Sequence, residues 1–297
     1  LAIISAGRFC WQHLAHLGAE VIKVETVDRG DLARQLGADS KLNAAGMGVS
    51  FLAQNAGKKS VTVNLKELKG KELFIKLVES ADVLVENFRP GVMARLGVDY
   101  ETLKSINQTL IYCAISGFGQ DGPWVHRPAY DQIIQGVSGV MSITGADDSA
   151  PLRVGYPVAD TVGGITAAFA ISAALNESPR GNFIDISMLE SVLATMGWAV
   201  SNYLIAGVKP SANGNENPTS APSGAFEAAR GLINIAANKD EQWVLLTDHL
   251  GVPELRDHPD YATREDRKRH RLALKPELET VLRTRPAHDL AADMTRL

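Results

Sequence analysis

The sequence predicts an α/β protein built on a doubly wound, mostly parallel sheet. Two observations carry this prediction. Short apolar or alternating segments typical of strands recur through the first 115 residues, and segments with apolar residues at helical spacing separate most of them. Strands that alternate with helices in this way favour parallel pairing with helices on both faces. The chain has 297 residues, 45% of them apolar, which is long enough for one large domain and a smaller one.

The expected elements follow one another in order. They are a helix at 9–17, a strand at 21–24, a strand at 60–65, a helix at 72–80, a strand at 83–85, a helix at 99–106 and a strand at 110–115. Gly18 is a typical helix stop, and Asp99 is a favoured helix cap. In such sheets ligands bind outside the carboxyl ends of the strands. The segment 86–91, directly after the third expected strand, is therefore a candidate binding loop.

The residue composition of the sequence changes after Asn202. The segment 209–223 is rich in Pro, Gly, Asn and Ser, which indicates an extended connection. Beyond it we expect a strand at 232–236, a helix at 241–250 and a charged, solvated helical stretch at 260–271. The predicted organisation is a large domain at 1–208, a linker at 209–224 and a small domain at 225–297. Because the chain starts at Leu1 rather than Met and stops inside a helical pattern, we expect it to be a fragment that lacks both ends, with an incomplete small domain.

Composition narrows the classes of partner. A net charge of −4 argues against nucleic acid or an anionic membrane as the main partner. The apolar stretch 163–175 is too short to span a bilayer. Two cysteines, Cys10 and Cys113, cannot build a disulfide framework and do not suggest a metal site, so we expect them to pack in the core of a cytoplasmic protein.

Asp160 is the strongest candidate for a catalytic residue. It stands at the mouth of an apolar segment, just before the helical run 165–175. One interpretation is that Asp160 caps this helix, since Asp is a favoured N-cap. The other is that its carboxylate is a nucleophile. Gly163 and Gly164 fit either close helix packing or free amide donors for a reaction intermediate.

One literal motif needs a separate interpretation. Residues 117–122 spell G-x-G-x-x-G after a predicted strand, as dinucleotide-binding loops do. That motif requires a helix to open at the third glycine. Pro123 and Trp124 follow Gly122 here, and the segment 121–123 is typical of a turn. A nicotinamide-dependent enzyme is therefore the weaker alternative.

Seven motifs occur in a fixed order along the chain: 19–25, 58–61, 81–91, 116–119, 130–131, 138–141 and Asp160. Together they resemble the class III CoA-transferases, the family of formyl-CoA transferase, carnitine CoA-transferase and the α-methylacyl-CoA racemases. The resemblance covers nearly the whole chain and is densest from 19 to 190. It implies a Rossmann-like large domain, a smaller α+β domain, two chains interlocked as a dimer, and coenzyme A as a substrate.

The resemblance also implies roles for individual residues. Asp160 matches the aspartate that becomes acylated, and Tyr130 and Asp131 match the substrate pocket. The positions that match the CoA-binding segments are Ile4, Ser5, Ala6, Val63, Asn64, Leu65, Lys66, Asn87, Phe88, Arg89 and Arg95. Thr26 and Pro128 replace basic residues of some transferases. We therefore expect other basic side chains to bind the nucleotide phosphates. The candidates are Arg29, Lys59, Lys66 and Arg127.

The choice within the family depends largely on position 130. The racemases carry a histidine there to move the α-proton, whereas this chain has Tyr130. A phenol with a pKa near 10 is a poor proton shuttle at neutral pH. Tyr130 is expected to line the thioester site or to be a core aromatic, and His126 to be a loop histidine.

The sequence thus predicts transfer of CoA from an acyl-CoA to a free carboxylic acid, a small dicarboxylate being one candidate, without a metal. An acyl-CoA racemase or a non-catalytic CoA-binding fragment are the alternatives.

Overall fold

The computed structural model describes residues 5–295, so the predicted CoA contact at Ile4 lies outside the described residues. The chain divides into two compact units, which we describe separately. The first comprises the chain up to Met141 together with Arg153–Pro210, and the second comprises Ser142–Leu152 and Ser211–Leu297. Within residues 5–295, no helix is long and apolar enough to cross a membrane.

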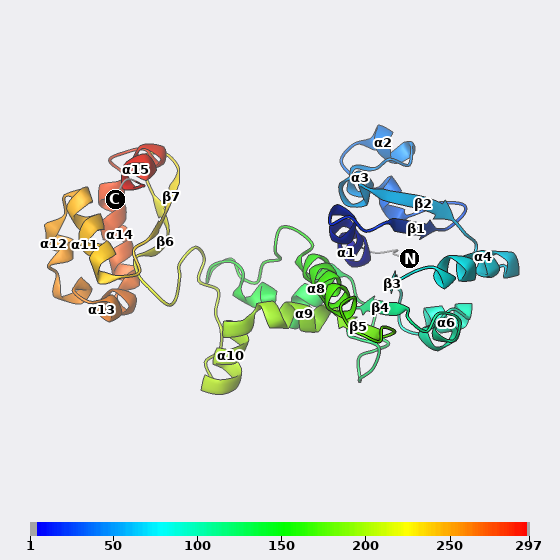
Figure 1. Ribbon diagram of the computed structural model, residues 1–297. Coiled ribbons are helices and arrows are strands. Elements are labelled where there is room, and N and C mark those ends of the chain that lie inside the picture. Colours follow the sequence, from blue (N-terminus) through cyan, green and yellow to red (C-terminus); the bar gives the residue numbers. More distant parts are fainter. Residues whose placement is uncertain (1–4, 296–297) are drawn as a thin grey trace. The chain divides into compact units, whose positions relative to one another are not determined.

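All strand pairs of the first unit are parallel (Figure 1). Strand β1 (Val21–Glu25) pairs with β2 (Lys58–Thr62), and β3 (Val83–Glu86), β4 (Ile111–Ser116) and β5 (Phe183–Ser187) form a three-stranded sheet in that order. Val83 lies opposite Ile111, and Tyr112 lies opposite Phe183. The prediction of an α/β protein with parallel strands is confirmed.

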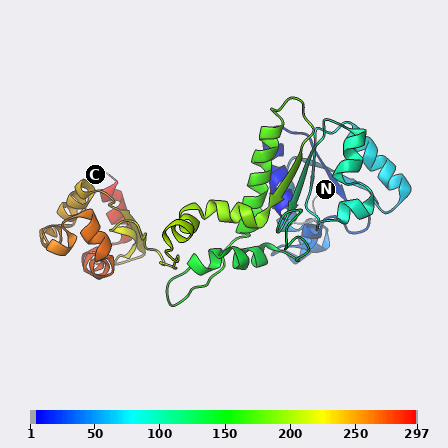
Figure 2. The same cartoon turned by 90° about the horizontal axis from the view of Figure 1, so that it is seen from below.

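Helices cover both faces of the three-stranded sheet. Helix α8 (Val158–Ala174) packs on β4 and β5, and α1 (Ser5–His16) packs on α8 (Figure 2). Alternate residues of β4 face two different cores, because Cys113 and Ile115 join the core under α1 and α8, whereas Tyr112 and Ala114 join the core under the helices of the opposite face. The other helices of this unit are η1 (Leu32–Gln35), α2 (Ser40–Ala44), α3 (Val49–Asn55), α4 (Leu68–Glu79), α5 (Val92–Leu96), α6 (Tyr100–Ile106), α7 (Asp131–Ser138), α9 (Met188–Thr195) and α10 (Gly197–Ala206), with η2 (Val140–Ile143) at its boundary.

Most local predictions in this unit hold. Asp99 caps α6 by accepting a hydrogen bond from the Thr102 amide at 3.0 Å. Cys10 and Cys113 are free thiols buried in the core, as expected. Strand β2 differs from its prediction, because it ends at Thr62 and leaves Val63 and Leu65 as buried core residues beyond it.

The second unit combines a two-stranded sheet with helices. Strands β6 (Ser223–Glu227) and β7 (Leu232–Ala236) are antiparallel and share a core with the helices around them. These helices are α11 (Asp240–Leu250), α12 (Pro253–Arg256), η3 (Pro259–Tyr261), α13 (Arg264–Arg269), α14 (Arg271–Leu282) and α15 (Ala287–Met294). The segment 142–152 belongs to this unit, where the Gly214 amide donates to the Gly145 carbonyl at 2.7 Å.

The prediction of a charged, solvated helical stretch at 260–271 is only partly right, because α13 is helical and exposes Arg264, Glu265 and Arg269. The segment breaks into η3 and α13, and the side chain of Arg267 is fully buried. Its guanidinium donates to the carbonyls of Ala221 and Tyr261 and pairs with Asp240 at 2.6 Å. Burial is tolerated because these acceptors satisfy the charged group.

Candidate active site

A pocket lies at the carboxyl ends of β3 and β4, where parallel sheets bind ligands. Four stretches that are distant in sequence meet there: the loop after β3, the end of β4 with the segment after it, the first turn of α8, and the start of α9. The lining residues are Asn87, Phe88, Arg89, Pro90, Ser116, Gly117, Phe118, Val125, Arg127, Ala129, Tyr130, Asp160 and Met188. Six residues that the sequence singled out, Asn87, Phe88, Arg89, Arg127, Tyr130 and Asp160, therefore share one pocket.

Asp160 lies in the first turn of α8 and is only 6% exposed. Burial, and to a lesser degree the nearby carboxylate of Asp131, raise the pKa of Asp160 to about 7, while the guanidinium of Arg8 acts in the opposite direction. Its Oδ1 atom is buried without a hydrogen-bond partner among the described residues. The pocket wall therefore carries a carboxyl group that titrates near neutral pH and keeps one oxygen uncommitted.

Asp160 is not the cap of its helix, so that interpretation is wrong. Helix α8 begins at Val158, two residues before Asp160, and its cap position is Pro157, which makes no side-chain cap. Asp131 caps the helix instead: its Oδ1 accepts hydrogen bonds from the amides of Ala159 at 2.8 Å and Asp160 at 3.3 Å. A carboxylate at a helix N-terminus is stabilising.

Gln135 completes the support of Asp131. It lies one turn later in α7 and is fully buried. Its Nε2 donates to Asp131 Oδ2 at 2.6 Å, and its Oε1 accepts from the Val154 amide at 2.8 Å. Asp131 is thus held on both oxygens and lies behind the pocket wall, where it fixes the first turn of α8.

The loop after β3 is held by two buried polar groups. Asn87 donates from Nδ2 to the Ile115 carbonyl on β4 at 2.7 Å. The carboxylate of Glu86 accepts from the Phe88 amide at 2.6 Å, and burial raises the pKa of Glu86 to about 7. These contacts fix the backbone from which Phe88 and Arg89 enter the pocket wall.

The segment after β4 contributes aromatic and cationic side chains to the pocket wall. The guanidinium of Arg127 lies 4.4 Å from the centre of the Trp124 ring, and Trp124 packs edge-on against Phe118. Tyr130 is 60% exposed, so the alternative that it is a core aromatic is wrong. His126 is exposed in a turn, as expected for a loop histidine.

The glycine motif at 117–122 has a packing explanation. No helix opens at Gly122; residues 123–126 form a turn. A Cβ atom at Gly117 would lie 2.2 Å from the Cβ of Ala129, so glycine is required where the two sides of this loop meet.

The remaining predicted CoA contacts do not line this pocket. Asn64 and Lys66 are exposed beyond the end of β2, where Asn64 Oδ1 accepts from the Lys66 amide at 3.1 Å. Arg95 is exposed on α5. Ser5 begins α1, and Ala6 is fully buried against α8.

Sequence reasoning missed Trp124, Phe118 and Met188 in the pocket wall, and Arg8 and Gln135 behind it. Only Gln135 carried a local signal, since it lies four residues after Asp131 and so on the same helical face.

Comparisons with known proteins identify the family. The family model for CoA-transferase family III matches residues 1–297. The chain is 39% identical over 286 residues to a succinate–glutarate CoA-transferase of Agrobacterium fabrum, covering 94% of this chain and 72% of that protein. It is 39% identical over 285 residues to an acetyl-CoA:oxalate CoA-transferase of Acetobacter aceti, covering 95% and 72%.

Solved structures agree with this match. A CAIB/BAIF family protein from Brucella suis superposes with a TM-score of 0.86 at 36% identity, covering all of this chain and 79% of that one. Rv3272 from Mycobacterium tuberculosis superposes with a TM-score of 0.85 at 28% identity, covering 99% and 78%. The chain therefore belongs to CoA-transferase family III, and it is a class III CoA-transferase.

Proposed function

We propose that this enzyme transfers CoA from an acyl-CoA donor to a free carboxylic acid, with Asp160 as a covalent nucleophile. The observation that carries the proposal is the carboxyl group of Asp160, which titrates near neutral pH, keeps Oδ1 unpartnered and faces the pocket between the loop after β3 and the first turn of α8. A carboxylate with an uncommitted oxygen is suited to attack a carbonyl.

The proposed reaction has two steps with the donor and two with the acceptor. Asp160 attacks the thioester carbonyl of the donor, the C–S bond breaks, and CoA leaves as a thiolate while Asp160 becomes a mixed anhydride. The thiolate then attacks the aspartyl carbonyl, which releases the donor acid as a carboxylate and leaves an aspartyl-CoA thioester. The acceptor acid repeats these two steps in reverse order. Dividing the exchange in this way replaces one difficult step with easier ones.

The surrounding residues have supporting roles in the proposal. Asn87, Phe88 and Arg89 hold the CoA near its thioester end, and Arg127, oriented by Trp124, contributes a cation to the same pocket. In the proposal, the predicted CoA contacts outside the pocket bind the nucleotide part of CoA. These contacts are Ser5, Ala6, Val63, Asn64, Leu65, Lys66 and Arg95. Tyr130 lines the thioester site, and Asp131 fixes the helix that carries Asp160.

We propose a small dicarboxylate as the acceptor. The two relatives described above are named for succinate with glutarate and for oxalate, and a further one, from Haloarcula marismortui, is named a succinyl-CoA:mesaconate CoA-transferase. Arg89 and Arg127 line the pocket that contains Asp160. A guanidinium binds a carboxylate through paired hydrogen bonds, so one arginine is suited to the carboxylate that does not react.

We also propose that the enzyme works as an interlocked dimer. Helix α10 carries large apolar side chains that are exposed in the single chain, among them Leu204 and Ile205. Exposed apolar surface of this kind is typical of a protein interface.

Replacing the nucleophile tests the proposal. Asp160→Asn keeps the size of the side chain and removes the charge that attacks. We expect CoA transfer to fall at least about a thousandfold, as with other covalent nucleophiles, while the protein still folds. Transfer is measured as new CoA thioesters by mass spectrometry, with succinyl-CoA and a panel of dicarboxylic acids.

Asp185→Asn is the matched control. Asp185 lies outside the pocket, its Oδ2 accepts from the Gln120 amide at 2.7 Å, and an asparagine retains that acceptor. Its transfer rate should match the wild type. Near-normal turnover in Asp160→Asn would exclude the covalent mechanism. In the wild type, incubation with acyl-CoA should place a hydroxylamine-sensitive adduct on Asp160.

A further inference from the structure

The two parallel sheets of the first unit leave a cavity between them. Within residues 5–295, β1 pairs with β2 as its one partner strand and β3 pairs with β4 as its one partner strand. A cavity of about 470 Å³ is lined by three residues of β1 and three of β3, and also by residues that precede each strand. We call this cavity the β1–β3 slot. Because neighbouring strands of a sheet lie only about 4.8 Å apart, a cavity between two strands has room for a further strand.

Apolar side chains cover the slot on both faces of the sheet. Leu14 of α1 and Ile171 of α8 line it from one core, and Phe74 and Val78 of α4 line it from the other. A strand that is buried on both faces consists of an uninterrupted run of apolar residues such as Val, Ile and Leu. The walls of the slot therefore fit an apolar strand.

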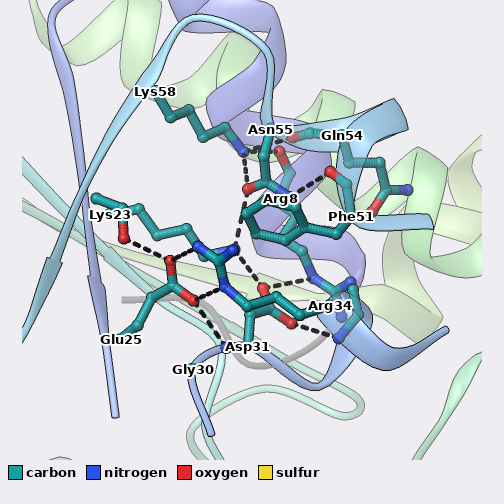
Figure 3. Close-up of polar contacts among 12 residues, drawn as sticks. Arg8, Lys23, Glu25, Gly30, Asp31, Arg34, Phe51, Gln54, Asn55 and Lys58 are labelled. Carbon is teal, nitrogen blue, oxygen red and sulfur yellow. Dashed lines mark hydrogen bonds and ion pairs between the residues drawn. The ribbon is translucent and has the colours of Figure 1, made fainter. Parts of the chain in front are cut away.

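Buried polar contacts hold α1 and α3 on the same face of β1 and β2 (Figure 3). Lys23 of β1 donates to Asn55 Oδ1 of α3 at 2.9 Å. Lys58 of β2 donates to the carbonyl of Gln54 in α3 at 2.7 Å and to the carbonyl of Arg8 in α1 at 2.8 Å. The two helices also pack on each other. Both therefore cover the same side of this strand pair.

The hand of the chain crossovers shows which strand is missing. The chain passes from β1 to the parallel strand β2 through α3, and such crossovers are right-handed in nearly all proteins. Helix α1 lies on the same face as α3 and leads into β1, as a crossover helix does when a strand precedes it. For both crossovers to have the same hand, that preceding strand must lie on the edge of β1 away from β2. This is the edge at the slot.

The next crossover agrees with this placement. The chain passes from β2 to β3 through α4, which packs in the core of the opposite face. A right-handed crossover on the opposite face runs in the opposite direction across the sheet. It therefore carries the chain back past β1 and past the slot to β3.

We propose that a strand of this protein's own chain, upstream of residue 1, fills the β1–β3 slot and joins β1 and β3 into one parallel sheet. Strands β1, β3 and β4 have four to six residues, so a run of about five apolar residues without proline has the required length. The chain matches 72% of the Agrobacterium fabrum relative, so that relative is the longer protein.

The added strand has a consequence for the pocket that contains Asp160. In a parallel sheet its carboxyl end lies at the same edge as those of β3 and β4, where this pocket is. Crossovers leave the added strand and β3 in opposite directions, and doubly wound sheets bind ligands at such a switch point. The loop between the added strand and α1 therefore lies beside the pocket loop at 87–90.

Hydrogen exchange of the backbone amides tests the inference without relying on turnover. The full-length protein is compared with residues 1–297, and exchange is read by mass spectrometry. We expect the amides of β1 and β3 to exchange at least about tenfold more slowly in the full-length protein, because the added strand pairs with both. Strands β6 and β7 of the second unit are the matched control, and their exchange should be the same in both proteins.

A pair of variants in the full-length protein decides the matter if residues 1–297 do not fold alone. Proline and alanine separately replace the central residue of the upstream apolar run. Proline removes a ladder hydrogen bond and is excluded from central strands, whereas alanine keeps that bond. We expect the proline variant to exchange faster in β1 and β3 than the alanine variant, or to be the one that fails to fold.

Four results would overturn the inference. The first is a natural sequence with no apolar run of strand length upstream of residue 1. The second is equal protection of β1 and β3 in the two proteins, which would mean that these strands close on each other. The third is protection in residues 1–297 that rises with protein concentration, which would assign the slot to a second copy. The fourth is equal exchange in the proline and alanine variants.

Discussion

At the scale of single residues, the site contains two carboxyl groups that burial keeps weakly acidic. Both Glu86 and Asp160 have a pKa raised to about 7. Such a carboxyl group has a higher pKa in the folded protein than in the unfolded protein. Below about pH 4 it is protonated in both the folded and the unfolded protein, so it does not reduce stability there. Its cost grows as pH rises towards 7 and is complete above it. Such groups reduce stability at the pH where the enzyme is expected to act, which is typical of functional sites.

Glu86→Gln should therefore stabilise the protein in a pH-dependent way. The amide oxygen of glutamine can still accept from the Phe88 amide, but the group no longer has to ionise. A rise of the pKa from 4.5 to about 7 corresponds to about 3 kcal/mol at pH 8. Urea denaturation at pH 8 and pH 4 measures the effect, which should vanish at pH 4.

The exposed Glu72 on α4 is the control. Glu72→Gln should change the free energy of unfolding by less than about 0.5 kcal/mol at either pH. An equal gain for Glu86→Gln at both pH values would show that the effect comes from packing and not from ionisation.

At the scale of elements, the contact between α1 and α8 fixes the position of the site. Gly164 is needed there because the Ala6 carbonyl approaches to 2.7 Å of where its Cβ would lie, and Ala167 and Ile171 continue the same buried face. A glycine inside a helix costs about 1 kcal/mol relative to alanine, so the close packing offsets a real loss of helix stability. This packing accounts for Gly164 without a role as an amide donor.

Gly164→Ala should destabilise the protein despite its better helix propensity. The added methyl group must push α1 away from α8, which costs about 1–3 kcal/mol, as overpacking typically does. The shift in the denaturant midpoint measures it. Gly197→Ala, at the start of α10, is the matched control because its Cβ would meet nothing within 4 Å, so it should be neutral or slightly stabilising. Equal behaviour of the two variants would contradict the packing account.

The elements also show where sequence reasoning succeeds and where it stops. The helix ending before Gly18, the cap at Asp99 and the buried strand before Asn87 depend on neighbouring residues, so local patterns predict them. The first turn of α8 depends on Asp131, which lies 29 residues before Asp160, and no local rule reveals that a distant side chain caps a helix. The burial of Arg267 has the same origin, since its acceptors include Ala221, 46 residues away.

At the scale of the whole molecule, the site is assembled from segments around 87–90, 116–130, 160 and 188. Strand order and the parallel-sheet rule predicted a binding loop after β3, and the pocket lies at this edge of the sheet. They could not show that Trp124 orients Arg127, because that contact depends on the path of an irregular loop. The ordered motifs pointed to Asp160. Its raised pKa depends on the tertiary structure, first through burial and then through the charges of Asp131 and Arg8.

The last prediction concerns assembly. The proposed dimer requires the apolar side chains of α10 to be covered, because Leu204 is 73% and Ile205 is 87% exposed in the single chain. Sedimentation velocity should give twice the chain mass for the wild type, and the double variant Leu204→Lys, Ile205→Lys should shift the protein towards monomer. Leu272→Lys on α14 is the control, since Leu272 is 75% exposed yet lies outside α10, and it should leave the dimer intact. Because two charged residues cannot be buried in an apolar contact without a large cost, a double variant that remains fully dimeric would place the interface elsewhere. A wild type that sediments as a monomer at every concentration would contradict the dimer itself.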